Sequence, residues 1–381
     1  MKRIGAIVIV CALLFTLCPV SVRAAPAEVA AKSAILMDAA TGTILYEQNA
    51  HEKLAPASVT KVMTMLLIME AIEAGRIGWD EQVTASEAAA AKGGSQVYLK
   101  VGETMTVTDM VKSIAVSSAN DCACAMAEHI AGSEEAFVER MNQRAKELGM
   151  LDTHFVNCTG LDDAPNAAEH LTSAHDIALM SRELLVKHPK IKEFTTIWMD
   201  TIRNGTFGLS NTNKMVRFYP GATGLKTGFT SAAGYCLSAS AQRDGMELIA
   251  VVMGSESSQA RFAACKSLLD YGFANYALIQ PEFQAGQVSV NLGTVGSVRA
   301  IPTESPQLLI DRAQRGSVTT DIDLEERVTA PVSRGQRLGT MTVRSGQQIL
   351  RQIPLVAAEP VTKLTWGQMF VRILRKVTMA R

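Results

Sequence analysis

The chain has 381 residues, of which 48% are hydrophobic and 19% are charged, and its formal net charge is zero. This length is enough for two or three domains of about 150 residues, with ample apolar material for their cores. The balanced charge argues against a general nucleic-acid-binding protein, because such proteins carry an excess of basic residues.

The first residues show a pattern that is typical of export. Lys2 and Arg3 precede the apolar run IGAIVIVCALLFTLCPV, and small residues follow around Ala24. We therefore predict a secretory signal peptide over residues 1–24. An uncleaved membrane anchor is the alternative, although a spanning helix needs about 20 apolar residues. Both interpretations export the rest of the chain.

Five cysteines lie beyond the predicted signal peptide, and an odd number does not indicate a disulfide framework. They are Cys122, Cys124, Cys158, Cys236 and Cys265. Cys122 and Cys124 lie two positions apart on a predicted helix, so their side chains diverge and make a poor metal pair. We predict that the cysteines are small buried side chains and that the chain holds no metal.

The region after the signal peptide begins with strands and continues with helices. SAILMDAATGTILYEQNA alternates and predicts a hairpin that turns at Thr41 and Gly42. A helix is expected from Pro56 to about Ala74, with proline at its start and glycine after its end. Residues 107–148 predict further helices, the last of them capped at Ser133.

The rest of this region predicts one more helix and then a sheet. The helix is HLTSAHDIALMSRELLVKH, with Thr172 or Ser173 near its cap. The strands GLKTGFT, GYCLSASAQRDG and MELIAVVMG follow, the last two joined by a turn at 243–245. The helix SSQARFAACKSLLDYGF closes the region. We predict an antiparallel sheet with helices packed on it, in a domain over residues 25–276.

After residue 276 the composition changes to short β-type runs broken by Gly, Pro and Ser, which predict a small β domain over residues 277–358. The last residues, 359–381, place apolar side chains at helical spacing on one face and basic ones mostly off it. The apolar set is Trp366, Phe370, Ile373 and Val377, and the basic set is Arg372, Arg375 and Lys376.

A basic amphipathic helix with an aromatic residue is typical of a segment that lies on a membrane surface. The alternative is a terminal helix packed on its own domain. Together with export, the membrane interpretation places the protein on the outer face of the cytoplasmic membrane.

Ser58 and Lys61 stand three positions apart at the start of the predicted helix, so their side chains share one face. The free N–H groups and the dipole of a helix start stabilise a serine alkoxide or an oxyanion. A lysine can take the serine proton only as the neutral amine, and burial lowers the pKa of lysine. The alternative for this pair alone is a helix-start serine beside a lysine that reaches solvent.

Two further segments carry chemistry that matches this pair. Ser118 and Asn120 form a Ser-x-Asn pattern within VSSAND. Lys226, Thr227 and Gly228 lie on a predicted strand within GATGLKTGFTSAAG. Gly228 lets a substrate backbone lie close to the strand, and Lys226 and Thr227 offer a cation and a hydroxyl to a carboxylate. An edge-strand Lys-Thr beside a turn is the alternative for this segment alone.

Ser-x-x-Lys, Ser-x-Asn and Lys-Thr-Gly, in this order, are the motif set of penicillin-binding proteins and serine β-lactamases. The sequence resembles the low-molecular-mass D-alanyl-D-alanine carboxypeptidases over most of residues 30–276. The similar segments include ILMDAATGTILYEQNAHEKLAPASVTKVMT, SSANDCACAMAEHIAGS, NCTGLDD and GLKTGFTSAAGYCLSASA. The resemblance implies an α/β (α+β) penicillin-binding domain with an antiparallel sheet flanked by helices, followed by a small all-β domain.

The resemblance also implies roles for the motif residues. Ser58 would be the nucleophile that forms an acyl-enzyme, and Lys61 would be its general base. Ser118 would relay protons toward the leaving amine, and Asn120 would hold the substrate amide.

On the other side of the implied site, Lys226 and Thr227 would bind the terminal carboxylate beside Gly228. The N–H groups of Ser58 and Phe229 would form the oxyanion hole. Arg261 would add a carboxylate contact, or would be a surface arginine.

The implied reaction is removal of the terminal D-alanine from peptidoglycan stem pentapeptides, with penicillin acylating the same serine and no cofactor needed. One alternative is a serine β-lactamase, which needs a deacylating glutamate; Glu169 lacks the expected context. The other is an inactive relative that binds cell wall. The chain departs from the family pattern at Phe229, where some relatives have His, at Cys158, where Pro is frequent, and at His175, where Arg is frequent.

Overall fold

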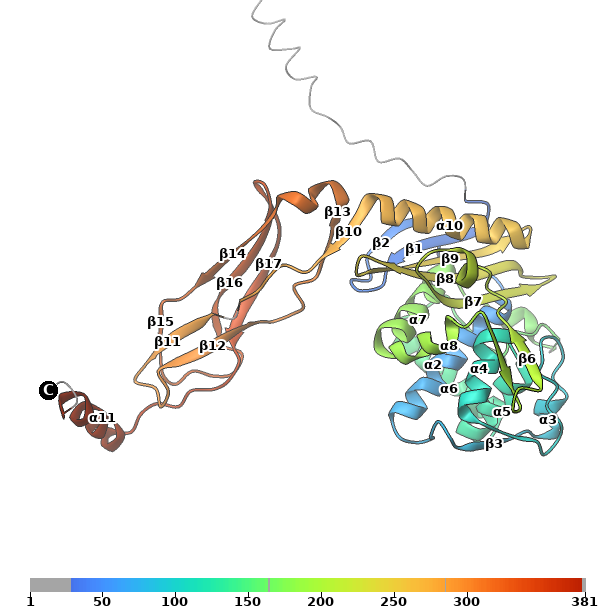
Figure 1. Ribbon diagram of the computed structural model, residues 1–381, viewed down its shortest axis with the longest axis horizontal. Coiled ribbons are helices and arrows are strands. Elements are labelled where there is room, and N and C mark those ends of the chain that lie inside the picture. Colours follow the sequence, from blue (N-terminus) through green and yellow to red (C-terminus); the bar gives the residue numbers. More distant parts are fainter. Residues whose placement is uncertain (1–28, 164, 285, 379–381) are drawn as a thin grey trace, which may run out of the picture.

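The computed structural model describes residues 29–163, 165–284 and 286–378, so the predicted signal peptide lies outside the described residues. Figure 1 shows a larger body of helices on a sheet and, beyond it, an elongated β body with a helix at its far end. The larger body carries all three motifs.

The larger body is built on a five-stranded sheet in the order β2-β1-β9-β8-β7, in which every neighbouring pair is antiparallel. Its strands are β1 Ser33–Asp38, β2 Ile44–Gln48, β7 Ala222–Thr230, β8 Gly234–Arg243 and β9 Met246–Ser255. The predicted hairpins are confirmed. In the second of them, Asp244 and Gly245 both have positive φ, as the tightest hairpin turns require.

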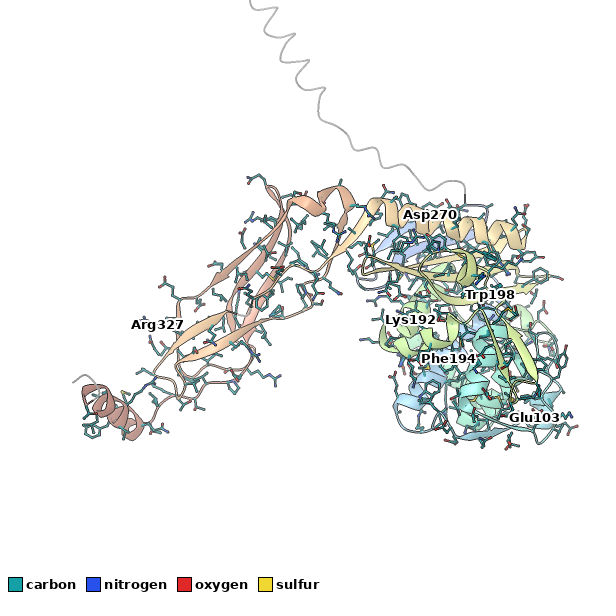
Figure 2. The ribbon with its side chains drawn as sticks, viewed as in Figure 1. Glu103, Lys192, Phe194, Trp198, Asp270 and Arg327 are labelled. Carbon is teal, nitrogen blue, oxygen red and sulfur yellow. The ribbon has the colours of Figure 1, made fainter. Side chains whose placement is uncertain are left out.

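Helices cover both faces of this sheet (Figure 1). Helix α10, Ser258–Asn275, packs on one face. The other face packs against a helical block. The longer helices of this block are α2 Lys61–Glu73, α4 Val107–Ser117, α5 Asn120–Ala131, α6 Glu134–Glu147 and α7 Ala174–Lys187. Figure 2 shows Asp270 on α10 and Phe194 within the opposite helical layer.

Short elements join these layers. They are η2 Ala57–Thr60, β3 Gln82–Thr84, α3 Glu87–Ala90, β4 Thr104–Thr106, η3 Ala167–Glu169, η4 Pro189–Ile191, α8 Lys192–Thr195, β5 Met199–Ile202, β6 Phe207–Ser210 and α9 Met215–Phe218. Ser133 and Ser173 accept hydrogen bonds from the N–H groups of Ala136 and Asp176, so both predicted helix caps are confirmed. The five cysteines are free and buried, as predicted.

The helix predicted from Pro56 to about Ala74 begins later than expected. Residues 57–60 form the single 3-10 turn η2, and the α-helix α2 starts at Lys61. Ala57 has a φ of +47°, a left-handed conformation that an α-helix cannot contain. Ser58 therefore lies on a tight turn directly before the helix.

The C-terminal body has a sheet and an apolar core of its own. Its six-stranded sheet has the order β14-β16-β17-β12-β11-β15, and β10 pairs with β13 beside it. The elements are β10 Tyr276–Ile279, β11 Gln287–Asn291, β12 Ser297–Pro302, β13 Leu308–Asp311, η5 Arg312–Ser317, β14 Val318–Leu324, β15 Arg327–Thr329, β16 Arg337–Ser345, β17 Gln348–Ala357 and α11 Trp366–Thr378. The predicted fold class is confirmed.

Candidate active site

The three motifs come together where β7 passes η2. A Cβ atom added to Gly228 would lie 2.7 Å from the carbonyl oxygen of Pro56 and 3.1 Å from the nitrogen of Val59. Only glycine therefore allows this strand to lie directly against the turn that carries Ser58. The motif glycine thus sets the approach of the strand to the nucleophile turn.

Thr212 links the end of α4 to β7. Its N–H donates to the carbonyl of Val116, and its hydroxyl accepts a 2.7 Å hydrogen bond from Thr227. Val116 lies two residues before Ser118. Hydrogen bonds of Thr212 therefore connect the Ser-x-Asn segment to the Lys-Thr-Gly segment. The sequence predicted no role for Thr212.

Lys61 is buried beside Ser58. Its Nζ lies 3.0 Å from Ser58 Oγ and donates a 2.7 Å hydrogen bond to the carbonyl oxygen of Thr159. Burial lowers the pKa of Lys61 to about 7, against smaller opposing effects of Cys158 and Asp121. A substantial fraction of the amine is therefore neutral near pH 7 and can accept a proton. The alternative of a lysine that reaches solvent is wrong.

Thr159 belongs to the NCTGLDD segment, one of the segments that resemble the carboxypeptidases. The sequence predicted no role for this segment. Asn157 Oδ1 accepts hydrogen bonds from the N–H groups of Thr159 and Gly160 and so holds this loop. The carbonyl of Cys158 accepts from Thr64 on α2. Cys158 therefore lies next to the residue that holds the Lys61 amine.

Ser118 and Asn120 lie at the junction of two helices. Ser118 ends α4 in the left-handed conformation, with φ of 63°, and Asn120 begins α5. The side-chain Nδ2 of Asn120 donates a 2.7 Å hydrogen bond to the carbonyl oxygen of Gly93. Its Oδ1 is buried and has no hydrogen-bond partner among the described residues. A buried unpaired acceptor is costly, so this oxygen is available to a ligand N–H group.

Lys226 is also buried, and its Nζ donates to the carbonyl of Thr227 at 2.8 Å. Burial, and then the charges of Lys61 and Arg261, lower the pKa of Lys226 well below its usual value. Among the described residues, no salt bridge joins Lys61, Lys226 or Arg261 to an acidic group. The site therefore favours an anion.

Arg261 reaches the site from α10. It is buried, and its Nη1 donates to the carbonyl oxygens of Gly228 at 2.8 Å and Cys236 at 3.3 Å. The surface-arginine alternative is therefore wrong. Its Nε is buried without a partner among the described residues. Arg261 braces the Lys-Thr-Gly strand from behind and adds positive charge.

Two residues named from the sequence lie at the edge of this arrangement. Phe229 is 53% exposed, and its ring packs at 4.3 Å between centroids on that of Tyr235. Glu169 is exposed on η3. Within the described part of the chain, no three His, Cys, Asp or Glu side chains gather closely enough to hold a metal ion.

Comparisons with known proteins agree with this geometry. Residues 20–257 match the D-alanyl-D-alanine carboxypeptidase family, and residues 273–363 match the C-terminal domain of penicillin-binding protein 5. D-alanyl-D-alanine carboxypeptidase DacF of Bacillus subtilis is 42% identical over 340 residues, which cover 87% of this chain and 86% of that protein.

Solved structures are similar as well. Penicillin-binding protein 5 from Haemophilus influenzae is 29% identical with a TM-score of 0.76, covering 89% of this chain and 100% of that one. Penicillin-binding protein D2 from Listeria monocytogenes, in its ampicillin-bound form, is 32% identical with a TM-score of 0.59, covering 64% of this chain and 98% of that one. The chain therefore belongs to the D-alanyl-D-alanine carboxypeptidase family of serine-type hydrolases.

Proposed function

We propose that the chain removes the terminal D-alanine from peptidoglycan stem pentapeptides through an acyl-enzyme on Ser58. The observation that carries this proposal is the 3.0 Å contact between the Ser58 hydroxyl and the buried amine of Lys61. An amine with its pKa lowered to about 7 is matched to a general base that works near neutral pH.

In the first step, the neutral Lys61 amine accepts the Ser58 proton as Oγ attacks the carbonyl before the last D-alanine. The N–H groups of Ser58 and Phe229 receive the developing oxyanion, where removal of one such donor costs about 3 kcal/mol. The C–N bond breaks, and Ser118 relays the proton to the leaving amine. Water then hydrolyses the ester and frees Ser58.

The substrate's free carboxylate is the natural ligand for the cationic side of the site. Lys226 and Thr227 bind it, and the buried charge of Arg261 supports them. The unpaired Oδ1 of Asn120 accepts the substrate amide N–H group. Penicillin carries a carboxylate and a reactive carbonyl as well, so it acylates the same serine, and the Listeria relative was solved with ampicillin bound.

The experiment that tests this function is mass spectrometry of a stem pentapeptide incubated with purified protein. We expect the loss of one alanine, blocked by penicillin, and neither peptide cleavage nor covalent penicillin labelling in Ser58→Ala. Labelling that persists in Ser58→Ala would move the nucleophile elsewhere. Rapid penicillin turnover without peptide cleavage would favour a β-lactamase, and the absence of both would favour an inactive relative.

We further propose that the chain is exported and rests on the outer face of the cytoplasmic membrane through α11. Trp366 and Phe370 on this helix are 86% and 65% exposed, and Ile373 is exposed beside them. Arg372 donates to the carbonyl of Gly293, so it joins α11 to the β domain. The side chains of Arg375, Lys376 and Val377 lie outside the described part of the structure.

None of the described helices is long and apolar enough to cross a membrane. A surface contact is tested by deleting residues 360–381, which should move the mature protein into the soluble fraction. A full-length control with Trp366→Ser and Phe370→Ser keeps the basic residues and should be released in the same way. A truncated protein that still pellets with membranes would exclude α11 as the anchor.

A further inference from the structure

His170 lies behind the turn that carries Ser58, and no step of the proposed mechanism uses it. The side chain is buried, with its ring edge-on to Phe155 at 5.6 Å between centroids. Its Nε2 lies 2.8 Å from the hydroxyl oxygen of Thr60, and its Nδ1 accepts a 3.2 Å hydrogen bond from the N–H of Val156.

These contacts determine which ring nitrogen carries the proton. A backbone N–H can only donate, so Nδ1 is unprotonated and Nε2 carries the hydrogen. Nε2 therefore donates to Thr60 Oγ1, and the Thr60 hydroxyl donates in turn to the carbonyl oxygen of Ala57 at 2.8 Å. An ordered series of hydrogen bonds thus runs from Val156 through His170 to Ala57.

Ala57 is the residue before Ser58, and its backbone is strained. A non-glycine residue with φ of +47° costs on the order of 1–3 kcal/mol, and it persists only where its surroundings fix it. On one side, Gly160 packs so closely that an added Cβ would overlap the Ala57 carbonyl oxygen, at 1.9 Å. On the other side, the hydroxyl of Thr60 holds the same oxygen.

The imidazole keeps this arrangement because it stays neutral. Burial, and then the nearby His154 and Lys61, lower the pKa of His170 to about 4. Protonation would place a second N–H on Nδ1, directly facing the N–H of Val156. A neutral ring therefore maintains one tautomer, and one direction of hydrogen bonding, at neutral pH.

We propose that His170 is a positioning residue for acylation, which acts through Thr60 on the Ala57–Ser58 peptide and keeps the Ser58 hydroxyl within reach of Lys61. The proposal rests on the proposed role of Ser58 as nucleophile. The carboxylate-binding strand β7 does not take part in this hydrogen-bond series. Loss of His170 should therefore slow acylation without weakening substrate binding.

Two variants test the hydrogen bonds at Nε2 and at Nδ1 of His170 separately. His170→Gln places an amide nitrogen near the position of Nε2 and can still donate to Thr60. His170→Asn places an oxygen near Nδ1 and can still accept from Val156, but it is too short to reach Thr60. We expect His170→Asn to slow acylation by fluorescent penicillin about 10- to 100-fold, as misplacement by a fraction of an ångström to 1 Å does.

In the same assay, His170→Gln should retain acylation within about threefold of wild type. For the peptide substrate, His170→Asn should lower kcat by the same factor and leave KM within about twofold. His154→Asn is the matched control, because His154 is an exposed histidine whose backbone pairs with Leu171, the residue after His170. The His154→Asn protein should be acylated at the wild-type rate. Melting temperatures of all variants report any loss of folding.

Thr60→Val provides an independent test, because it keeps the shape of the side chain and removes the hydroxyl. It should slow acylation as much as His170→Asn does, and the double variant should show no further loss, since both remove the same connection. If His170→Asn fails to fold, Thr60→Val alone decides the question.

Mapping the penicillin label in the wild-type protein distinguishes the two proposals. A label away from Ser58 would contradict the proposed function. With the label on Ser58, wild-type acylation by Thr60→Val or by His170→Asn would overturn the role of His170. Equal slowing by His170→Gln and His170→Asn would also overturn it, because His170 would then only fill space.

Discussion

Replacing Lys61 with methionine should have opposite effects on stability and on activity, because burial of the charged amine destabilises the fold whereas acylation requires the amine. Burial lowers the pKa of Lys61 from 10.5 to about 7, and one pKa unit corresponds to about 1.4 kcal/mol. The folded protein thus disfavours the charged amine by about 5 kcal/mol. Because the folded pKa is lowered, the unfolded chain binds more protons, so the penalty is complete below pH 7 and shrinks as the pH rises toward 10.5.

Methionine removes this penalty but leaves the carbonyl of Thr159 without its donor, which costs about 2 kcal/mol. We therefore expect Lys61→Met to raise the free energy of unfolding by about 2–3 kcal/mol at pH 7 and to change it little at pH 9, where the remaining penalty is about 2 kcal/mol. Acylation by penicillin should fall by several orders of magnitude.

Urea unfolding of both proteins at pH 7 and pH 9 measures this difference, and penicillin labelling measures the activity. Lys92→Met is the control, because Lys92 forms an ion pair with Glu134 and its pKa is raised. That variant should be less stable than wild type, since it leaves a partly buried carboxylate unpaired. A Lys61→Met protein that is less stable than wild type at pH 7 would refute the reasoning about a lowered pKa.

The remaining predictions concern acylation and binding. The acylation rate should fall about tenfold per pH unit below pH 7 and level off above it; a flat profile in stopped-flow labelling would exclude Lys61 as the base. Gly228→Ala should slow acylation by about 100-fold or more, because its Cβ meets the carbonyl of Pro56, whereas Gly208→Ala, with open space around it, should acylate normally. Binding of a D-alanine-terminated peptide to Ser58→Ala should take up protons, because the carboxylate raises the lowered pKa of Lys226. Calorimetry in two buffers over a series of pH values measures the uptake, and no uptake at any pH would place the carboxylate elsewhere.

Features set by neighbouring residues in the sequence were predictable. The Arg-Asp-Gly turn between β8 and β9 and the caps at Ser133 and Ser173 follow from residues within three or four positions of each other. The order of the three motifs identified the family because the chemistry needs all of them at once. Local patterns therefore predicted the fold class and the residues that the structure brings together.

Features that depend on distant parts of the chain were not predictable in the same way. Thr159 is 98 positions from Lys61, and only the folded loop presents its carbonyl to the amine. Arg261 resembles a surface residue in sequence, because its partner carbonyls on β7 and β8 are brought to it by the sheet. His170 has an ordinary polar setting in sequence, and its contact with Thr60 spans 110 positions. Hydrogen bonds of this range have no signature in local spacing.

The shared burial of Lys61 and Lys226 connects binding to chemistry. The charge of Lys61 is one cause of the lowered pKa of Lys226, and repulsion between two like charges acts equally in both directions. A substrate carboxylate beside Lys226 favours the protonated form of that amine. The carboxylate also attracts a proton on Lys61, and the proton on Lys226 offsets that attraction, so the pair adds little net charge beside the general base. Pairing the free acid end of the substrate with Lys226 therefore lets the site bind an anion and still leave Lys61 able to accept the Ser58 proton, which an unpaired carboxylate at the same place would oppose.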